Sequence, residues 1–299
     1  HLFSVFFCYD SLVIGLGSAV ESVWLRTAGV LEAYTERWAL VTGASSGIGA
    51  EFARVLAGNG MHLVLTARRG DLLEELAQEL QQQHMVQTLV LVEDLSSPGA
   101  VTRILERVAA QDITLELLVN NAGFGFVGEV TETDVDLMLS MVQLNVLALT
   151  ELTYRVLPGL LQLGHGAIIN VASVVAMQPV AYMPVYSASK AFVLHFSEAL
   201  WAEARDHGVT VMALCPGTTQ TEFFDVAGVP GWLKKHRSQT ARQVVKEALR
   251  GLERRRSYLV TGLLNYVSSL GARFATRKTV VTQTMKFFRP RLTEDPDES

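Results

Sequence analysis

Three side chains in the middle of the chain have the types and spacing needed to move a proton to or from a carbonyl oxygen. Tyr186 precedes Lys190 by four residues, and Ser173 lies thirteen residues before the tyrosine. On a helix over residues 183–207, positions i and i+4 share a face, so the ammonium can approach the phenol. A nearby positive charge lowers a tyrosine pKa from about 10, and a serine can bind the same substrate oxygen. The spacing predicts an acid–base tyrosine, but taken alone it is more typical of an ordinary surface helix.

A glycine-rich turn near residue 45 provides an independent indication of function. Residues 38–49 read WALVTGASSGIG, an apolar run that predicts a strand, followed by a turn that opens a helix. Glycines at 43, 47 and 49 let the backbone approach a pyrophosphate, while the helix N-terminus supplies N–H donors. The spacing differs from the common G-x-G-x-x-G fingerprint, and a glycine-rich turn without a ligand is the alternative.

The elements that must position these groups follow from the alternation of apolar patterns. Strands are expected over 38–42, 62–66, 86–92, 115–120, 166–172, 209–215 and 257–260, and helices over 47–59, 71–83, 98–110, 134–163, 183–207 and 240–254. The strand segments are mostly apolar, as expected for a sheet covered on both faces. This alternation predicts an α/β fold with a doubly wound, Rossmann-like parallel sheet of about seven strands. Ligands of such sheets bind outside the carboxyl ends of the strands.

The chain resembles the short-chain dehydrogenase/reductase family from about Arg37 to about Tyr258. The matching motifs are Thr42-Gly43-x-x-x-Gly47-x-Gly49, Asn120-Asn121-Ala122-Gly123, Pro216-Gly217-x-x-x-Thr221, and the set Asn145, Ser173, Tyr186 and Lys190, which matches the family's catalytic tetrad. The resemblance implies reversible hydride transfer between a nicotinamide and a carbonyl or alcohol carbon. Ser173 and Tyr186 would hold the oxygen, Tyr186 would carry the proton, Lys190 would hold the nicotinamide ribose, and Asn145 would anchor a water.

By the same resemblance, the cofactor site draws on the ends of several strands. The implied cofactor-binding residues are Gly43, Ser45, Ser46, Gly47, Ile48, Gly49, Arg68, Asp94, Leu95, Asn121, Ala122, Gly123, Tyr186, Lys190, Pro216, Gly217, Thr219 and Thr221. The position where an NAD enzyme of the family carries an acid is held by Ala67, and Arg68 follows it. An arginine there can bind a 2′-phosphate in bidentate fashion, which favours NADP(H). A solvated arginine pair is the alternative for Arg68, and a turn aspartate is the alternative for Asp94.

The composition narrows the class of protein. The chain has 299 residues, 49% of them hydrophobic, and a net charge of −5. It has no basic stripe, so we expect no nucleic acid partner. Cys8 and Cys215 have neither metal nor disulfide-framework spacing, so we expect no metal site and a reducing, cytoplasmic location, with peripheral membrane contact left open. Cys215 ends an apolar strand, which favours structural burial over nucleophilic chemistry.

Three parts of the chain are expected. Residues 1–36 form an apolar N-terminal extension, for which a packed helix, a membrane-surface helix and a disordered segment remain open. Residues 37–260 form the oxidoreductase domain. Residues 261–299 form a C-terminal extension with an acidic tail. Its stretch 263–288 combines aromatic and cationic residues, so peripheral binding to anionic lipid is one interpretation, and a helix docked beside the substrate site is the plainer one.

A segment over residues 218–240 is expected to border the substrate. It contains the aromatic run Glu222-Phe-Phe-Asp-Val-Ala-Gly-Val-Pro-Gly-Trp-Leu233, typical of either a mobile lid or a helix packed permanently on the core. The segments near Ser173 are apolar too, without an obvious cation for an acidic substrate. The sequence therefore favours a lipophilic ketosteroid, ketoacyl or long-chain aldehyde substrate. By resemblance, the chain is placed near hydroxysteroid dehydrogenases and 3-ketoacyl reductases.

Other assignments remain open. Apolar residues on helix 183–207 pack in the core or, by resemblance, form a homodimer or homotetramer interface together with helix 134–163. The alternative functions are an NAD-linked alcohol or steroid dehydrogenase, a non-catalytic NADP-binding regulator on the same fold, and a structural or membrane-docking protein.

Overall fold

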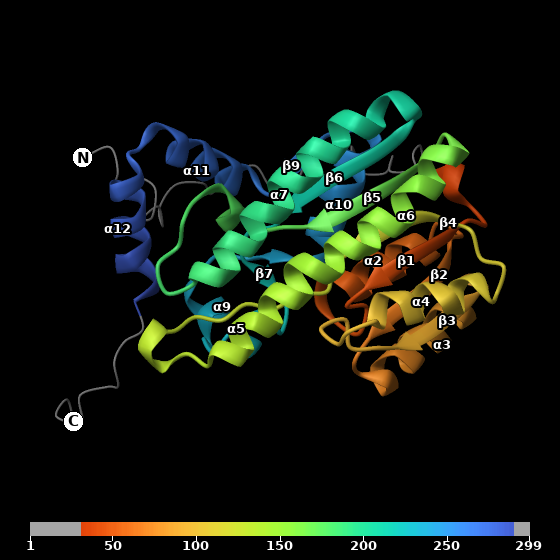
Figure 1. The fold of residues 1–299 in the computed structure, drawn as a ribbon, viewed down its shortest axis with the longest axis horizontal. Coiled ribbons are helices and arrows are strands. Elements are labelled where there is room, and N and C mark those ends of the chain that lie inside the picture. Colours follow the sequence, from red (N-terminus) through yellow and green to blue (C-terminus); the bar gives the residue numbers. More distant parts are fainter. Residues whose placement is uncertain (1–30, 290–299) are drawn as a thin grey trace, which may run out of the picture.

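The fold is described by a computed structural model that covers residues 31–289 (Figure 1). The predictions for residues 1–30 and for the acidic tail lie outside the described residues. Seven parallel strands form one sheet in the order β3-β2-β1-β4-β5-β6-β9, which confirms the doubly wound fold. The strands are β1 (Trp38–Thr42), β2 (His62–Ala67), β3 (Thr88–Val92), β4 (Leu115–Asn120), β5 (Gly166–Val171), β6 (Val209–Cys215) and β9 (Tyr258–Val260).

Helices cover both faces of the sheet. They are α2 (Gly47–Ala57), α3 (Gly70–His84), α4 (Ala100–Ala109), α5 (Val135–Val142), α6 (Leu149–Leu163), α7 (Pro184–Ala204), α8 (Phe223–Val226), α9 (Trp232–Lys235), α10 (Ala241–Glu253), α11 (Leu263–Phe274) and α12 (Arg277–Phe288). Successive strand residues point to opposite faces, so Val41 packs toward α2, α3 and α10, and Leu40 packs toward α4, α6 and α7. Both faces are buried, which explains why the strands read as nearly continuous apolar runs.

The strand order changes direction between β1 and β4, and this is where the cofactor crevice forms. From β1 the chain moves outward through β2 to β3, and β4 then begins the other half of the sheet. Thr42 and Thr66 are paired at the ends of β1 and β2. The turns after these strands therefore open on the same edge, at the topological switch point where such sheets bind ligands.

The helical run expected over 134–163 is interrupted by a π-helical turn, Gln143–Ala148, between α5 and α6. Its periodicity alone gave no sign of this turn, which is a common feature of functional sites. The whole run, Val135–Leu163, is long and apolar enough to cross a membrane. Its inner residues Leu152, Leu157 and Leu160 instead pack in the core beside the sheet, as in the central helix of a globular domain.

The segment expected to border the substrate is folded between two short strands. β7 (Thr219–Gln220) pairs in parallel with β8 (Gln239–Thr240), so the two ends of the segment lie side by side. Between them lie α8 and α9, each of four residues. The main-chain N–H of Val127 donates to the carbonyl of Ala227 at 3.1 Å, which fixes the segment to the loop after β4.

The two C-terminal helices lie together at one end of the molecule, away from α3 and α4 (Figure 1). The inner face of α12 carries Val280 and Thr284, both buried. The Thr284 hydroxyl accepts from the Ala181 N–H at 3.2 Å and donates to the Pro179 carbonyl at 3.4 Å. Helix α12 is therefore fixed to the loop that leads into the Tyr186 helix.

Candidate active site

The structure brings Ser173, Tyr186 and Lys190 together at the ends of β5 and β6. Ser173 follows β5, and the other two residues lie in the first turns of α7. The Ser173 and Tyr186 side chains share a hydrogen bond. The Lys190 ammonium lies 5.8 Å from the centre of the Tyr186 ring and donates to the Val171 carbonyl at 2.8 Å. The spacing in the sequence therefore places a phenol, a hydroxyl and an ammonium in one buried cluster.

The expectation that the Tyr186 pKa lies below its usual value is wrong for this structure. Burial raises the pKa of Tyr186 to about 12, and the hydrogen bond with Ser173 only partly opposes this rise. Burial lowers the pKa of Lys190 to about 8. Both shifts have the same cause, because a site shielded from water disfavours the charged form of either group. Near neutral pH, Tyr186 is a neutral phenol with a proton to donate.

Asn145 lies in the π-helical turn, and its side chain is bound by the main chain of the loop after β4. Its amide nitrogen donates to the Phe124 carbonyl at 2.9 Å, and its amide oxygen accepts from the Phe124 N–H at 3.2 Å. Gly123 lies between the Asn145 amide and the Lys190 ammonium. A Cβ there would come within 2.9 Å of the Asn145 amide oxygen and 3.4 Å of the Lys190 nitrogen. The close approach of this glycine keeps Asn145 and Lys190 in one cluster.

Hydrogen bonds with the residues that follow β4 fix the shape of the glycine-rich turn. The Thr42 hydroxyl accepts from the N–H groups of Asn121 and Ala122, both at 2.9 Å. The Asn121 amide donates to the carbonyls of Thr42 and Gly43 at 3.0 and 3.2 Å. Asn121 therefore shapes the turn itself. Gly43 has φ +65°, and a Cβ there would meet the Asn121 amide at 2.8 Å, so a side chain does not fit.

The turn suits the pyrophosphate of a dinucleotide. Gly47, with φ +58°, starts α2, and the Ser46 side chain does not cap this helix. The first N–H groups of α2 therefore lack a side-chain partner and point out of the helix N-terminus, the usual site for a phosphate. A Cβ on Gly49 would meet the Gly43 carbonyl oxygen, so the turn closes only with glycine there. Ser45 and Ile48 complete this turn.

The two arginines after β2 have different surroundings. Arg69, which we had not assigned to the site, donates to the Ser45 and Ser46 hydroxyls at 3.2 and 2.6 Å and pairs with Glu222 at 2.9 Å. It thus joins the glycine-rich turn to the segment before α8. The charge of Arg68 acts on Asp94 after β3. Both arginines can be read from the sequence, but which of them contacts the turn cannot.

Asp94 forms a local turn beside the crevice. Its carboxylate accepts from the N–H and the hydroxyl of Ser96 at 2.9 and 2.6 Å. Burial raises the pKa of Asp94, but the two Ser96 hydrogen bonds and the Arg68 charge outweigh it, so the net pKa is lowered. The following residue, Leu95, is buried in the core.

The segment after β6 crosses the crevice beside the glycine-rich turn. The Pro216 carbonyl accepts from the Val174 N–H at 2.9 Å, and the Thr219 hydroxyl donates to the Gly217 carbonyl at 3.0 Å. A Cβ on Gly47 would lie 2.9 Å from the Thr221 methyl carbon. Asn265 of α11, which the motif could not reveal, packs so tightly on Gly217 that a side chain there would overlap it.

The space around Tyr186 is apolar. One cluster of buried and partly buried residues surrounds its ring, and its members are Phe124, Phe126, Val127, Met138, Met141, Val175, Val180, Met183, Val185, Phe223 and Phe288. The Phe223 ring lies 5.3 Å from the Tyr186 ring, centre to centre, and leaves Tyr186 only 7% exposed. Further ring contacts run from Phe223 through Phe224 to Trp232, which stacks on Phe288.

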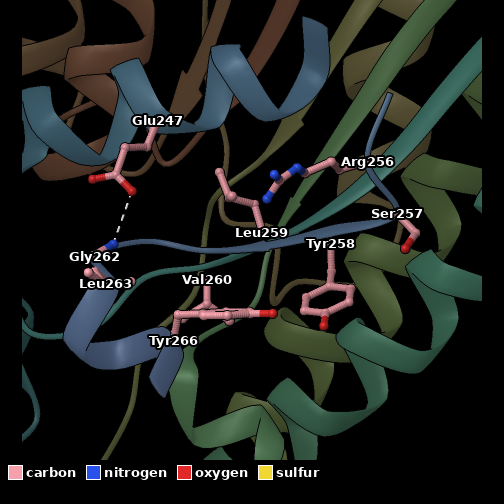
Figure 2. Close-up of a pocket in the computed structure, with 9 residues that line it drawn as sticks. All are labelled: Glu247, Arg256, Ser257, Tyr258, Leu259, Val260, Gly262, Leu263 and Tyr266. Atoms are coloured by element: carbon pink, nitrogen blue, oxygen red, sulfur yellow. Dashed lines mark hydrogen bonds between the residues drawn. The ribbon is translucent and has the colours of Figure 1, made fainter. Parts of the chain in front are cut away.

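Two other features complete the picture. Cys215 is buried, and burial raises its thiol pKa to about 12, which confirms a structural role for this residue. A hollow of about 620 Å³ lies along the free edge of β9, and Tyr186 is not among the residues that line it (Figure 2). In the residues described, no group of three or more histidine, cysteine or acidic side chains could hold a metal ion.

Comparison with known proteins agrees with this geometry. The short chain dehydrogenase model matches residues 37–228. The very-long-chain 3-oxoacyl-CoA reductase of Homo sapiens is 33% identical over 78% of this chain and 74% of its own length. The corresponding protein of Anas platyrhynchos is 34% identical, and the match spans 62% of its length. Sulfoacetaldehyde reductase 2 of Chromohalobacter salexigens is 40% identical over 62% of this chain and 73% of its own length.

Solved structures share the fold over most of this chain. A short-chain dehydrogenase from Sphingobium yanoikuyae, in complex with NADPH, has a TM-score of 0.73 at 33% identity and covers 88% of this chain and all of its own. A 7β-hydroxysteroid dehydrogenase has a TM-score of 0.77 at 25% identity, over 85% of this chain and 98% of its own. The chain belongs to the short-chain dehydrogenase/reductase family.

Proposed function

We propose that this protein is an NADP(H)-dependent reductase of lipophilic carbonyl compounds, of the ketosteroid, 3-ketoacyl or long-chain aldehyde type. The observation that carries the substrate class is the apolar cluster around Tyr186. Aliphatic, aromatic and methionine side chains pack against its ring in the described residues, and these offer contact to an apolar substrate but no charge to a carboxylate, sulfonate or phosphate. Binding a hydrophobic substrate there would bury apolar surface on both partners.

The relatives leave a second substrate class to test. Two reductases of similar sequence or fold are named for polar substrates, sulfoacetaldehyde and L-sorbose. A small polar substrate would need cationic or hydroxyl partners close to Tyr186. The cluster around the ring favours the lipophilic class, which agrees with the substrates in the names of the 3-oxoacyl-CoA reductase and the 7β-hydroxysteroid dehydrogenase.

NADP(H) is favoured over NAD(H) by the charge at the end of β2. Ala67 places no carboxylate there, so a 2′-phosphate would meet no repulsion from this position. Arg68 and Arg69 follow, and planar guanidinium groups bind phosphate in bidentate fashion. Arg69 also contacts the glycine-rich turn through Ser46.

The roles proposed for the catalytic residues agree with their placement. The bound nicotinamide supplies the hydride to the carbonyl carbon. Ser173 and Tyr186 hold the carbonyl oxygen, and Tyr186 gives its phenolic proton to that oxygen as negative charge develops on it. Lys190 lies within 5.8 Å of the Tyr186 ring, where its charge stabilises the phenolate left behind. Asn145 fixes the loop at Phe124 beside this site.

We also propose that two copies associate through α5, α6 and α7. Their outer faces expose large apolar side chains, which are Leu139, Val142, Leu147, Tyr154 and Phe192. Phe196 stacks on Phe192 and contacts Tyr154, so the two helices share one apolar face. A patch of this kind marks an interaction site. A monomeric mass for the full chain by light scattering at micromolar concentration would refute this arrangement.

The decisive experiment is a turnover assay that follows NADPH or NADH oxidation with a substrate panel. The panel contains ketosteroids, 3-ketoacyl thioesters, long-chain aldehydes, sulfoacetaldehyde and L-sorbose. We expect the highest kcat/KM with NADPH and a lipophilic carbonyl compound. A clear preference for the polar substrates, or for NADH, would overturn that part of the proposal. Tight NADPH binding without turnover of any carbonyl or alcohol would favour a non-catalytic regulator.

A further inference from the structure

Helix α11 exposes an apolar stripe. Leu263, Val267 and Phe274 lie within one narrow sector of the helix, because their spacings of four and seven residues return to the same face. Leu264 lies beside them. Leu263 is 77% and Phe274 is 90% exposed, and the other two are exposed as well. Contiguous apolar surface of this kind marks an interaction site rather than an ordinary solvated face.

Helix α12 combines apolar and cationic residues on its outer face. Val281 and Met285 are exposed in the middle of this face. Four exposed cations flank them, which are Arg277, Lys278, Lys286 and Arg289. The sequence from 254 to 289 contains eight arginines and lysines and no aspartate or glutamate, although the whole chain has a net charge of −5. The positive charge is thus concentrated at the C-terminal end of the described chain.

A short connection, Ala275-Thr276, joins the two helices. Phe274 ends α11 and Arg277 begins α12, so the apolar stripe and the cations meet at the bend between the helices. The inner face of α12 is anchored, because Thr284 binds the loop at Ala181 and Phe288 stacks on Trp232 of α9. Its outer face is therefore presented by a rigid element.

The apolar surface continues toward the free edge of β9. Leu263 and Tyr266 line the hollow that runs along this strand, together with Tyr258 and Val260 (Figure 2). Glu247, which lines its other side, accepts a hydrogen bond from the Gly262 N–H at 3.0 Å and so fixes the start of α11. At its N-terminal end, the stripe on α11 thus borders a hollow that combines apolar residues with the charged residues Glu247 and Arg256.

We propose that α11 and α12 dock on an anionic lipid surface. An apolar stripe bordered by arginine and lysine is the pattern of helices that lie in the interface of a membrane, with the apolar side chains inserted and the cations at the headgroups. A symmetric contact with a second copy of the chain would bring the cations of both copies together. Their repulsion disfavours a second copy as the partner of this surface. The docked helices would hold α9 close to the lipid through the Trp232–Phe288 stack, although lipid binding itself does not depend on the substrate proposed above.

The test is sedimentation of the full-length protein with vesicles. We expect binding to vesicles of equal parts phosphatidylcholine and phosphatidylglycerol, weaker binding to phosphatidylcholine alone, and a decrease as salt is raised. The double variant Lys278→Glu, Lys286→Glu should lower the partition coefficient by roughly 25-fold or more, since each cation contributes about fivefold near an anionic surface. The double variant Leu264→Glu, Val267→Glu should also release the protein.

A matched control places the same changes elsewhere. Met85, which follows the end of α3, and Arg107 of α4 are exposed away from this surface, so Met85→Glu, Arg107→Glu should leave vesicle binding unchanged. Circular dichroism and NADPH affinity check folding. If a charged variant misfolds, Val267→Ser and Lys278→Gln should still weaken binding by about fivefold each.

Three results would overturn the proposal. One is wild-type protein that stays in solution with anionic vesicles. Another is undiminished binding by the α11 and α12 variants, which would assign binding to another segment such as residues 1–30. The last is a variant that changes the molar mass without changing vesicle binding, which would make this surface a contact between copies of the chain.

Discussion

The ring of Phe223 lies 5.3 Å from the ring of Tyr186, centre to centre, and packs against it at a tilt of 45°. A Cβ on Gly125 would come within 2.7 Å of Phe223 and 3.1 Å of Tyr186, so the two rings and the loop after β4 are in close contact. A substrate that reaches the Tyr186 hydroxyl must therefore displace or lie along Phe223. This residue belongs to the segment for which a mobile lid and a fixed helix were both open.

We expect Phe223→Ala to change the size preference of the enzyme. Removing the ring opens space next to Tyr186, so the ratio of kcat/KM for a bulky ketone to that for a small one should rise about tenfold, the effect of a few methylenes in an apolar pocket. The matched control is Phe224→Ala, which removes the same volume from a ring that packs on Phe223 and Trp232. Equal ratios in the two variants would show that Phe223 does not shape the substrate space.

The variant Tyr186→Phe should bind NADPH with unchanged affinity and lose turnover. The buried ring remains, but no proton can reach the substrate oxygen, so kcat should fall by roughly 10²- to 10⁴-fold. NADPH binding by fluorescence titration and single-turnover kinetics measure the two effects. Tyr154→Phe serves as control, because the ring of Tyr154 is exposed on α6. Near-normal turnover of Tyr186→Phe would rule out this proton donor.

Lys190 should give the free energy of unfolding a distinct pH dependence. In the folded protein burial lowers its pKa to about 8, whereas an unfolded lysine titrates near 10.5. Between these values the unfolded state binds more protons, so stability rises with pH. Wild type should therefore become more stable relative to Lys190→Met between pH 8 and 10.5. Urea unfolding of both proteins at the two ends of this range provides the measurement, and parallel pH profiles would contradict the shift.

We expect alanine substitutions at Gly43 and Gly159 to have different effects on NADPH affinity and on stability. Gly43→Ala forces a Cβ to within 2.8 Å of the Asn121 amide at φ +65°, so we expect at least a tenfold loss of NADPH affinity. Gly159→Ala, inside α6, meets no heavy atom within 4 Å. It should leave affinity unchanged and raise stability by about 0.5–1 kcal/mol. Calorimetric titration and urea unfolding compare them, and equal NADPH affinities would refute the tight turn.

The roles of the two arginines after β2 can be distinguished by the effect of each substitution on cofactor preference. If Arg68 holds the 2′-phosphate, Arg68→Gln should raise KM for NADPH about tenfold and leave KM for NADH nearly unchanged. Arg69→Gln instead removes contacts with Ser46 and Glu222, so it should weaken both cofactors alike. Initial-rate kinetics with both cofactors decide the matter. A selective NADPH defect in Arg69→Gln would assign the phosphate to Arg69.

The fold was predictable because its signal is local. Apolar strand segments and amphipathic helices alternate along the chain, and β1, β4 and β6 have the predicted bounds. The π-helical turn was not predictable, because five- and four-residue repeats are too similar over a single turn. The start of β3 was placed two residues early, since Met85, which caps α3 after His84, has a left-handed conformation that its residue type does not indicate.

The side chains that could do chemistry can be recognised from local spacing, because motif residues such as Tyr186 and Lys190 are close in the chain and a helix brings them together. Their protonation depends on the tertiary structure, since burial by Phe223 and its neighbours involves segments far apart in the sequence. The tertiary structure also decided which arginine lies on the glycine-rich turn, because Arg69 and Glu222 are 153 residues apart and meet only in the folded protein. Spacing fixes local geometry, whereas solvent exclusion and long-range ion pairs arise from packing.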